Sequence, residues 1–153
     1  MAFRSRIRRL PGGGVRVELS QDERDLLRQV AGELRVLLEA ETDDPSLRRL
    51  YPSAHEDADR EREYRELTRN QLAAGRRRTL DVLEETAGRE ELRAEEADAW
   101  LRALNDARLV LGTRLDVTED YDWEALDEAT PRAQELALYA YLSWLQEQLI
   151  EAL

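Results

Sequence analysis

A single arginine interrupts the apolar face of a helix predicted over residues 94–111. Leucines recur along this face at helical spacing, and Arg108 lies between Leu104 and Leu111. A guanidinium inside a protein core costs several kcal/mol unless it is paired. Asn105, on the same helix, can supply one hydrogen bond. We therefore expect Arg108 to be buried against a carboxylate, either as a structural ion pair or as a site for an anion or a partner's carboxylate.

The expected carboxylates lie in a polar loop around the only histidine of the chain, His55. Asp57 and its neighbours Glu56 and Asp59 are the candidates for the ion pair with Arg108. His55 beside these acids is also suited to act as a general base that a carboxylate orients. However, no motif places a nucleophile near it, and the sequence has no Gly-x-Ser-x-Gly, phosphate-binding loop or Rossmann motif. We therefore predict no enzymatic activity and no catalytic residues.

The residue types that the chain lacks restrict its metal and redox chemistry. With no cysteine and one histidine, the chain cannot form disulfides, thiolate sites or multi-histidine metal sites. The acidic stretch over residues 116–124 offers oxygen ligands suited to calcium or magnesium, but it lacks the spacing and the glycine of an EF-hand. The prediction is a solvated acidic loop, with no metal site and no cofactor.

All 23 basic residues are arginines, and several lie in two groups. One group is in the N-terminal segment and the other is on a helix predicted over residues 59–86. If these elements pack side by side, they form a basic surface for nucleic acid, with contacts from Arg6, Arg8, Arg69 and Arg76. The net charge of −11 repels phosphate. We therefore expect nucleic-acid contact to be weak at most.

The last predicted helix carries apolar residues on more than one face. It opens at Thr130-Pro131, a threonine cap followed by proline at the first helical position. A helix of this kind is either central to a bundle or exposes a stripe for a partner. We predict a protein-partner or homodimer surface formed by Leu138, Tyr141, Leu142 and Leu145.

Four main helices and a short N-terminal β-hairpin are predicted to position these residues. Residues 1–19 alternate apolar and basic side chains around Pro11-Gly12-Gly13-Gly14, which indicates a hairpin. Its expected buried side comprises Phe3, Ile7, Val15, Val17 and Leu19.

Cap and stop signals set the expected helix bounds. A capping box of Ser20 and Glu23 begins the first helix, which ends before Pro45. Gly75, inside the helix over 59–86, is expected to allow close packing against a neighbour. The prediction is a mainly α fold in a single domain, 1–153, with the hairpin at 1–19 and the helical bundle at 20–153.

Length and composition are consistent with this organisation. The chain has 153 residues, of which 42% are hydrophobic and 37% are charged. No apolar run approaches the roughly 20 residues of a membrane span, and no secretory signal is recognised. We expect a cytoplasmic protein without a membrane partner.

The sequence resembles a known family. The block from Trp100 to Leu115, WLRALNDARLVLGTRL, carries most of the likeness, together with LYPSAH at 50–55 and YRELT at 64–68. On these motifs the chain resembles the actinobacterial domain-of-unknown-function family 2017, over nearly its whole length. The resemblance implies an intracellular protein without established enzymatic activity, often encoded beside the Clp protease adaptor, and with members suggested to regulate transcription. It implies no catalytic residues, and a cysteine-based switch cannot operate in a chain without cysteine.

The function we predict is therefore that of a non-enzymatic regulatory or adaptor protein that acts through protein–protein contacts or self-association. The alternative is a transcriptional regulator that contacts DNA through the arginine-rich hairpin and helix. A small-ligand site around Arg108 and His55 is a third possibility. A large exposed apolar stripe would favour the first, a contiguous basic patch the second, and a deep polar pocket at Arg108 the third.

Overall fold

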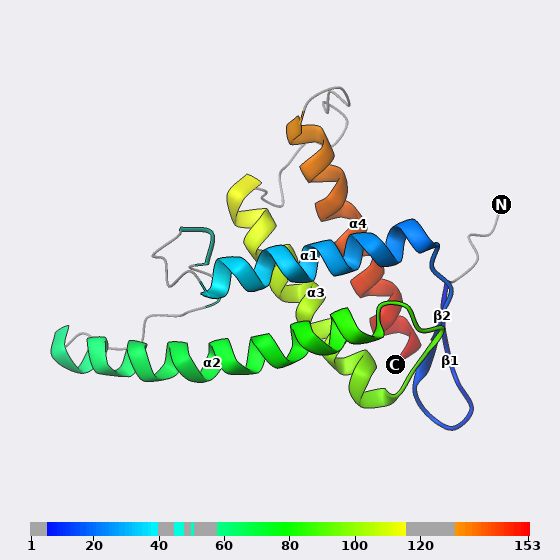
Figure 1. Cartoon of the computed structure of the whole chain (residues 1–153), viewed down its shortest axis with the longest axis horizontal. Helices are drawn as coiled ribbons and strands as arrows, with labels where there is room; N and C mark the ends of the chain where they lie inside the picture. The colour runs from blue at the N-terminus through cyan, green and yellow to red at the C-terminus, as the bar shows by residue number, and fades with distance from the viewer. Residues whose placement is uncertain (1–5, 40–44, 48–49, 51–57, 116–130) are drawn as a thin grey trace.

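Four helices and a small antiparallel sheet make up the computed structural model, which describes residues 6–39, 45–47, 50, 58–115 and 131–153 (Figure 1). The helices are α1 (Gln21–Glu39), α2 (Ala58–Thr86), α3 (Ala94–Leu115) and α4 (Pro131–Ala152), with a short 3-10 turn, η1 (Pro45–Leu47). The predicted mainly α fold with four main helices is confirmed. None of the described helices combines the length and hydrophobicity that a bilayer crossing requires.

The sheet contains one strand more than the predicted hairpin. Strands β1 (Ile7–Arg9) and β2 (Val15–Val17) form the hairpin, and β3 (Glu91–Leu92) pairs with β2, in the order β1-β2-β3. The turn requires glycine, because Gly13 and Gly14 have φ values of 94° and 81°. β3 has only two residues, so it carries no periodic pattern that sequence reasoning can detect.

The buried side of the hairpin is largely as predicted. Ile7, Val15 and Val17 are at most 2% exposed. Leu19 is partly buried, and Phe3 lies outside the described residues. The hairpin thus packs on the helices, as a lone hairpin must in water.

Local signals explain where the helices begin. The Ser20 hydroxyl accepts a hydrogen bond from the Glu23 amide (3.2 Å), and the Glu23 carboxylate accepts one from the Ser20 amide (3.1 Å). The predicted capping box is therefore confirmed. At the start of α3, Glu96 accepts a hydrogen bond from the Arg93 amide (2.9 Å) and pairs with Arg89.

The core surrounds α3, which contacts α1, α2 and α4. Trp100 is fully buried at its centre, and its indole N–H donates to the Thr86 hydroxyl at 2.6 Å. At the other end of α3, Gly112 lets α4 approach closely, because a Cβ there would lie 2.9 Å from the Tyr139 ring. α3 passes through Gly112 and ends at Leu115, four residues beyond the predicted end.

The expectation for Gly75 is wrong. Among the described residues, the only atom within 4 Å of a Cβ built at this position is a terminal nitrogen of Arg78, at 3.8 Å. Gly75 therefore does not allow a neighbouring helix to approach, and it lines an open cleft instead.

Candidate interaction surfaces

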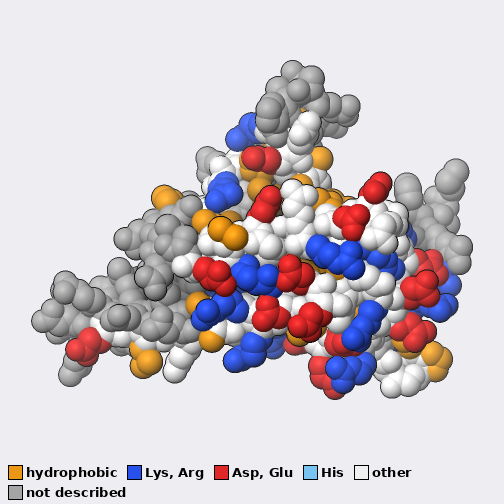
Figure 2. All heavy atoms as spheres, viewed as in Figure 1, with side chains coloured by type: hydrophobic (Ala, Val, Ile, Leu, Met, Phe, Trp, Pro, Cys, Tyr) orange, Lys and Arg blue, Asp and Glu red, His pale blue; other side chains and the backbone are white. Residues whose placement is uncertain are grey.

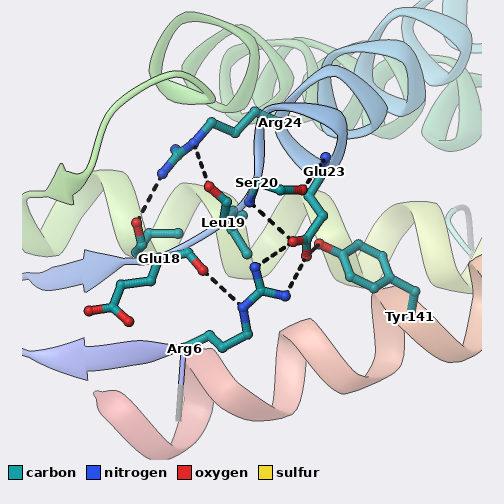
Figure 3. A network of polar contacts seen from close by, with 8 residues as sticks. Arg6, Glu18, Leu19, Ser20, Glu23, Arg24 and Tyr141 are labelled. Atoms are coloured by element: carbon teal, nitrogen blue, oxygen red, sulfur yellow. Dashed lines mark hydrogen bonds and ion pairs between the residues drawn. The ribbon is translucent and has the colours of Figure 1, made fainter. Parts of the chain in front are cut away.

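A network of hydrogen bonds centred on Glu23 ties the hairpin to two helices (Figure 3). Arg6, which precedes β1, donates both terminal nitrogens to the Glu23 carboxylate, at 3.0 Å for Nη1–Oε2 and with Nη2 against Oε1. The Tyr141 hydroxyl, from α4, donates to Glu23 Oε2 at 2.7 Å. Arg6 Nε also donates to the Glu18 carbonyl at 2.9 Å. One carboxylate thus joins β1, α1 and α4.

The electrostatics of this network keep Glu23 ionised. Burial raises the pKa of Glu23, but the hydrogen bonds from Arg6, Tyr141 and Ser20 outweigh burial and bring that pKa to about 2. Burial, followed by the bond to the Glu23 carboxylate, raises the pKa of the Tyr141 hydroxyl. The Tyr141 hydroxyl therefore stays protonated and acts as a hydrogen-bond donor. This network joins the hairpin to α1 and α4 and does not indicate proton transfer.

A second buried arginine, Arg24, was not singled out in the sequence. It is 6% exposed, and its guanidinium donates to four backbone carbonyls. Two belong to the segment that enters α1, Val17 (3.0 Å) and Leu19 (3.2 Å). The others follow α2, at Ala87 (2.9 Å) and Arg89 (2.6 Å). The signal was present, because Arg24 precedes the buried Leu27, Ala31, Leu34 and Leu38 at helical spacing.

Arg108, the residue that the sequence did single out, lies at the edge of the core. Arg108 is partly buried, whereas the prediction has it buried. The inner face of α3 is formed instead by Trp100, Ala103, Leu104, Ala107 and Val110. This face includes Ala103 and Ala107, so the leucine pattern alone placed it about one position away around the helix. Of the predicted partners, Glu56 and Asp57 lie outside the described residues, as does His55, and the side chain of Asp59 is not described either.

Arg108 belongs to a polar cluster between α3 and α4. Arg108 Nη2 donates to the Asn105 side-chain oxygen at 3.3 Å, as predicted, and Gln146 Nε2 donates to the same oxygen at 3.3 Å. The contacts of Asn105 with Gln146 and of Gly112 with Tyr139 show that α3 and α4 run antiparallel, which puts Ser143 level with Arg108. We refer to Asn105, Arg108, Ser143 and Gln146 as the α3–α4 seam.

Three polar atoms of the α3–α4 seam are left unsatisfied. Within the described part of the chain, Arg108 Nε, Ser143 Oγ and Gln146 Oε1 are buried without a hydrogen-bond partner. Nor do the described residues place a carboxylate against the Arg108 guanidinium. Buried groups of this kind are rare in folded proteins and call for a water, an ion or a partner.

The predicted partner surface on the last helix is wrong for two of its four members. Leu142 and Leu145 are completely buried within the chain, in contact with the common core. Leu138 and Tyr141 are partly buried and pack against that core as well. The apolar residues cover more than one face because α4 lies against both α3 and β1. This face is consequently not free for a second copy.

Two of the four predicted nucleic-acid contacts are engaged by carboxylates of the chain. Arg6 is bound to Glu23, and Arg76 is bound to Asp106, with Nε and Oδ2 3.2 Å apart. Arg8 is exposed on β1, whereas the side chain of Arg69 is not described. On the face shown in Figure 2, acidic and basic side chains are interspersed over α1 and α2. Arg35 illustrates this pairing, with bonds of 2.6 Å to both Asp81 and Glu84.

Comparison with known proteins identifies the family. The model of the family described as "Domain of unknown function (DUF2017)" matches residues 2–153. A Mycobacterium leprae protein named "Putative oxidative stress regulator AosR" is 31% identical over 129 residues, covering 72% of this chain and 59% of that protein. The "Oxidative stress regulator AosR" proteins of Mycobacterium tuberculosis and Mycobacterium bovis are each 38% identical over 71 residues, or 46% of this chain and 32% of theirs.

The chain thus spans less than two thirds of the length of these relatives. No solved structure matches it. The family match covers nearly all of the sequence, and the chain therefore belongs to the DUF2017 family, as the resemblance implied.

Proposed function

We propose that this member of the DUF2017 family is a non-enzymatic regulatory protein that acts by binding another protein at the α3–α4 seam. The names of its mycobacterial relatives support a regulatory role. The chain lacks cysteine, so the contact that we propose involves no thiol chemistry of these residues.

The observation that carries the proposal is the state of Arg108. Its guanidinium is partly buried, its Nε lacks a hydrogen-bond partner, and its one side-chain acceptor is the neutral oxygen of Asn105. Other described arginines that are partly buried, such as Arg35 and Arg76, have a carboxylate oxygen within 3.2 Å. A partner's carboxylate would supply the charged acceptor that Arg108 lacks among the described residues. The unsatisfied atoms of Ser143 and Gln146 are themselves buried, so they mark the polar character of the seam and are not surface contacts.

A small-substrate site at the seam is less well supported. The polar clefts found among the described residues are lined by other side chains, and Arg108 lines none of them. A shallow polar seam with a partly exposed arginine is typical of the protein–protein contacts in which arginine is enriched.

The test is a pair of charge-removing variants on α3. Arg108→Met keeps the side-chain volume and removes the charge of the seam, whereas Arg102→Met removes the charge of an arginine that pairs with Asp98 on another face of α3. Each tagged protein is purified from its native cells, and the associated proteins are identified by mass spectrometry. We expect the parent and Arg102→Met to retain the same partner and Arg108→Met to lose it.

Stability measurements make this result interpretable. Because the described residues place no carboxylate against Arg108, Arg108→Met strands no charge among them, and it should unfold within about 1 kcal/mol of the parent. Light scattering of all three proteins shows whether the partner is a second copy. A loss of several kcal/mol in Arg108→Met would show that Arg108 has an internal carboxylate, which would refute the proposal.

A DNA contact through the hairpin is the second candidate function. Arg8 and Arg16 lie directly opposite each other in the β1–β2 register, and both are exposed. Like charges in this position destabilise a strand pair, and only Arg16 has a described ion pair, to Glu91 at 3.7 Å. We expect the double variant Arg8→Gln/Arg16→Gln to lose a weak, salt-sensitive shift of duplex DNA. Nanomolar binding at physiological salt by the parent would favour the DNA reading over the protein-contact reading.

A further inference from the structure

A cleft of about 500 Å³ separates α2 from the first half of α3. Its size lies within the range of small-molecule sites, about 300–1,000 Å³. We call it the α2–α3 cleft, and its described lining comprises Gln71, Leu72, Gly75, Arg76, Arg78, Thr79, Val82, Asp98, Ala99, Arg102 and Asp106. It is separate from the α3–α4 seam, with which it shares no residue.

The cleft combines apolar walls with an ionic floor. Leu72, Val82 and Ala99 supply the apolar surface. On the floor, Arg76 Nε and Asp106 Oδ2 are 3.2 Å apart, with side chains 18% and 12% exposed. Burial raises the pKa of Asp106 in spite of the neighbouring Arg76, which indicates a floor with little access to water.

Gly75 opens the middle of the cleft. A glycine inside a helix costs stability relative to alanine, so its presence calls for a structural reason. A positive φ is not that reason, because among the described glycines only Gly13 and Gly14 have one. A close neighbour is not the reason either, since the nearest atom to a Cβ would be Arg78 Nη2 at 3.8 Å. The absence of a side chain at Gly75 therefore leaves space in the cleft.

Arg78 provides the cleft with a cation that is not already neutralised. Its guanidinium lies back over Gly75 instead of extending away from the helix, as the 3.8 Å distance shows. The other two arginines of the lining are paired, Arg76 with Asp106 and Arg102 with Asp98 at 2.9 Å. Among the described residues, no carboxylate forms an ion pair with Arg78.

From this geometry we propose that the α2–α3 cleft binds a small anionic molecule with a compact apolar body. Arg78 holds the anionic group, a carboxylate or a phosphate monoester, in the planar geometry that guanidinium favours. The apolar body occupies the space above Gly75, between Leu72 and Val82. Such a ligand would give the protein a small-molecule signal, independent of any partner at the α3–α4 seam.

The test measures calorimetric binding of three probes that share one ring to the full chain. Benzoate and phenyl phosphate carry the anionic group in its two forms, and benzamide is neutral. We expect saturable binding of at least one anionic probe, and affinity for benzamide at least about tenfold weaker, equivalent to about 1.4 kcal/mol. The proposal would be overturned if neither anionic probe showed saturable binding at concentrations up to about 10 mM. A dissociation constant of that size corresponds to a binding free energy of roughly 3 kcal/mol.

Two variants and one matched control locate the site. Arg78→Gln should weaken binding at least about tenfold. Arg77→Gln removes the same charge from the adjacent residue, which is exposed and does not line the cleft, so its binding should stay within about twofold of the parent. An equal loss in Arg77→Gln would show general electrostatic attraction and refute a specific site.

We expect Gly75→Leu to fill the cleft and to keep the fold. A Cβ meets only the flexible end of Arg78, and leucine has a higher helix propensity than glycine, so the melting temperature should not fall. The variant should nevertheless lose binding of the anionic probes. Unchanged binding in a Gly75→Leu protein that melts like the parent would place the ligand elsewhere and refute the proposal.

Discussion

Replacing Arg24 by methionine should destabilise the fold more than removing any surface ion pair. The side chain is 6% exposed, and its four hydrogen bonds hold the carbonyls of Val17, Leu19, Ala87 and Arg89. These carbonyls come from the hairpin, from the entry to α1 and from the exit of α2. Methionine fills most of the volume but donates no hydrogen bond, so all four carbonyls lose the guanidinium that links these segments.

The magnitude follows from the acceptors that are left behind. An unsatisfied buried carbonyl costs about 1–3 kcal/mol. Arg24 also lines a cleft of about 480 Å³ beside Arg6 and Glu90. Water that enters this cleft can form hydrogen bonds with some of the four carbonyls. The loss in free energy of unfolding should therefore be about 3–5 kcal/mol, which is less than the sum of four separate carbonyl penalties. That is a large part of the roughly 5–15 kcal/mol that stabilises a typical domain.

Urea unfolding followed by tryptophan fluorescence measures this cost, because Trp100 is fully buried. Arg28→Met is the matched control, one helical turn further along α1. Its guanidinium pairs with Asp25 at 3.2 Å in an exposed position, so this variant should lose less than about 1 kcal/mol. If Arg24→Met unfolded within about 1 kcal/mol of the parent, the idea that Arg24 joins the three segments would be refuted.

Two further predictions concern acid stability and close packing. Because the pKa of Glu23 is about 2 in the fold, below its ordinary value of 4.5, the unfolded chain takes up the proton first as the pH falls. The network should therefore contribute about 1–2 kcal/mol at neutral pH, discounted for partial exposure, and lose this contribution between about pH 4.5 and 2. Melting curves of the parent and Glu23→Gln should converge over this interval, and a constant gap would contradict the prediction. Gly112→Val should lower the free energy of unfolding by about 1–3 kcal/mol, because even a Cβ at this position would lie 2.9 Å from the Tyr139 ring. An unchanged melting temperature would contradict this prediction.

The features predictable from the sequence are those specified by neighbouring residues. Ser20 and Glu23 cap α1 through atoms three residues apart, so the pattern alone reveals the bond. The turn at Gly13 and Gly14 is likewise local. Helix α2 was placed within one residue at its start and correctly at its end, Thr86.

The features that were missed depend on distant residues. β3 exists because two residues meet the edge of β2, where Leu92 lies opposite Val15. The second role of Glu23, accepting from Arg6 and Tyr141, joins residues up to 118 positions apart. Leu142 and Leu145 were taken for a partner surface because a one-dimensional pattern does not show that α4 has neighbours on two sides.

The arginines show most clearly how tertiary context decides function. The rule that an arginine on an apolar face is buried and satisfied holds for Arg24, which found backbone carbonyls rather than an acid. Applied to Arg108, the same rule fails, because Arg108 lies at the edge of the buried face of α3, which Ala103 and Ala107 form together with Trp100 and Leu104. An exposed arginine such as Arg77 is solvated and needs no explanation. Arg108 is partly buried, and its Nε has lost contact with water without gaining a hydrogen bond from the described residues. That imbalance is the observation on which the proposed partner contact at Arg108 rests.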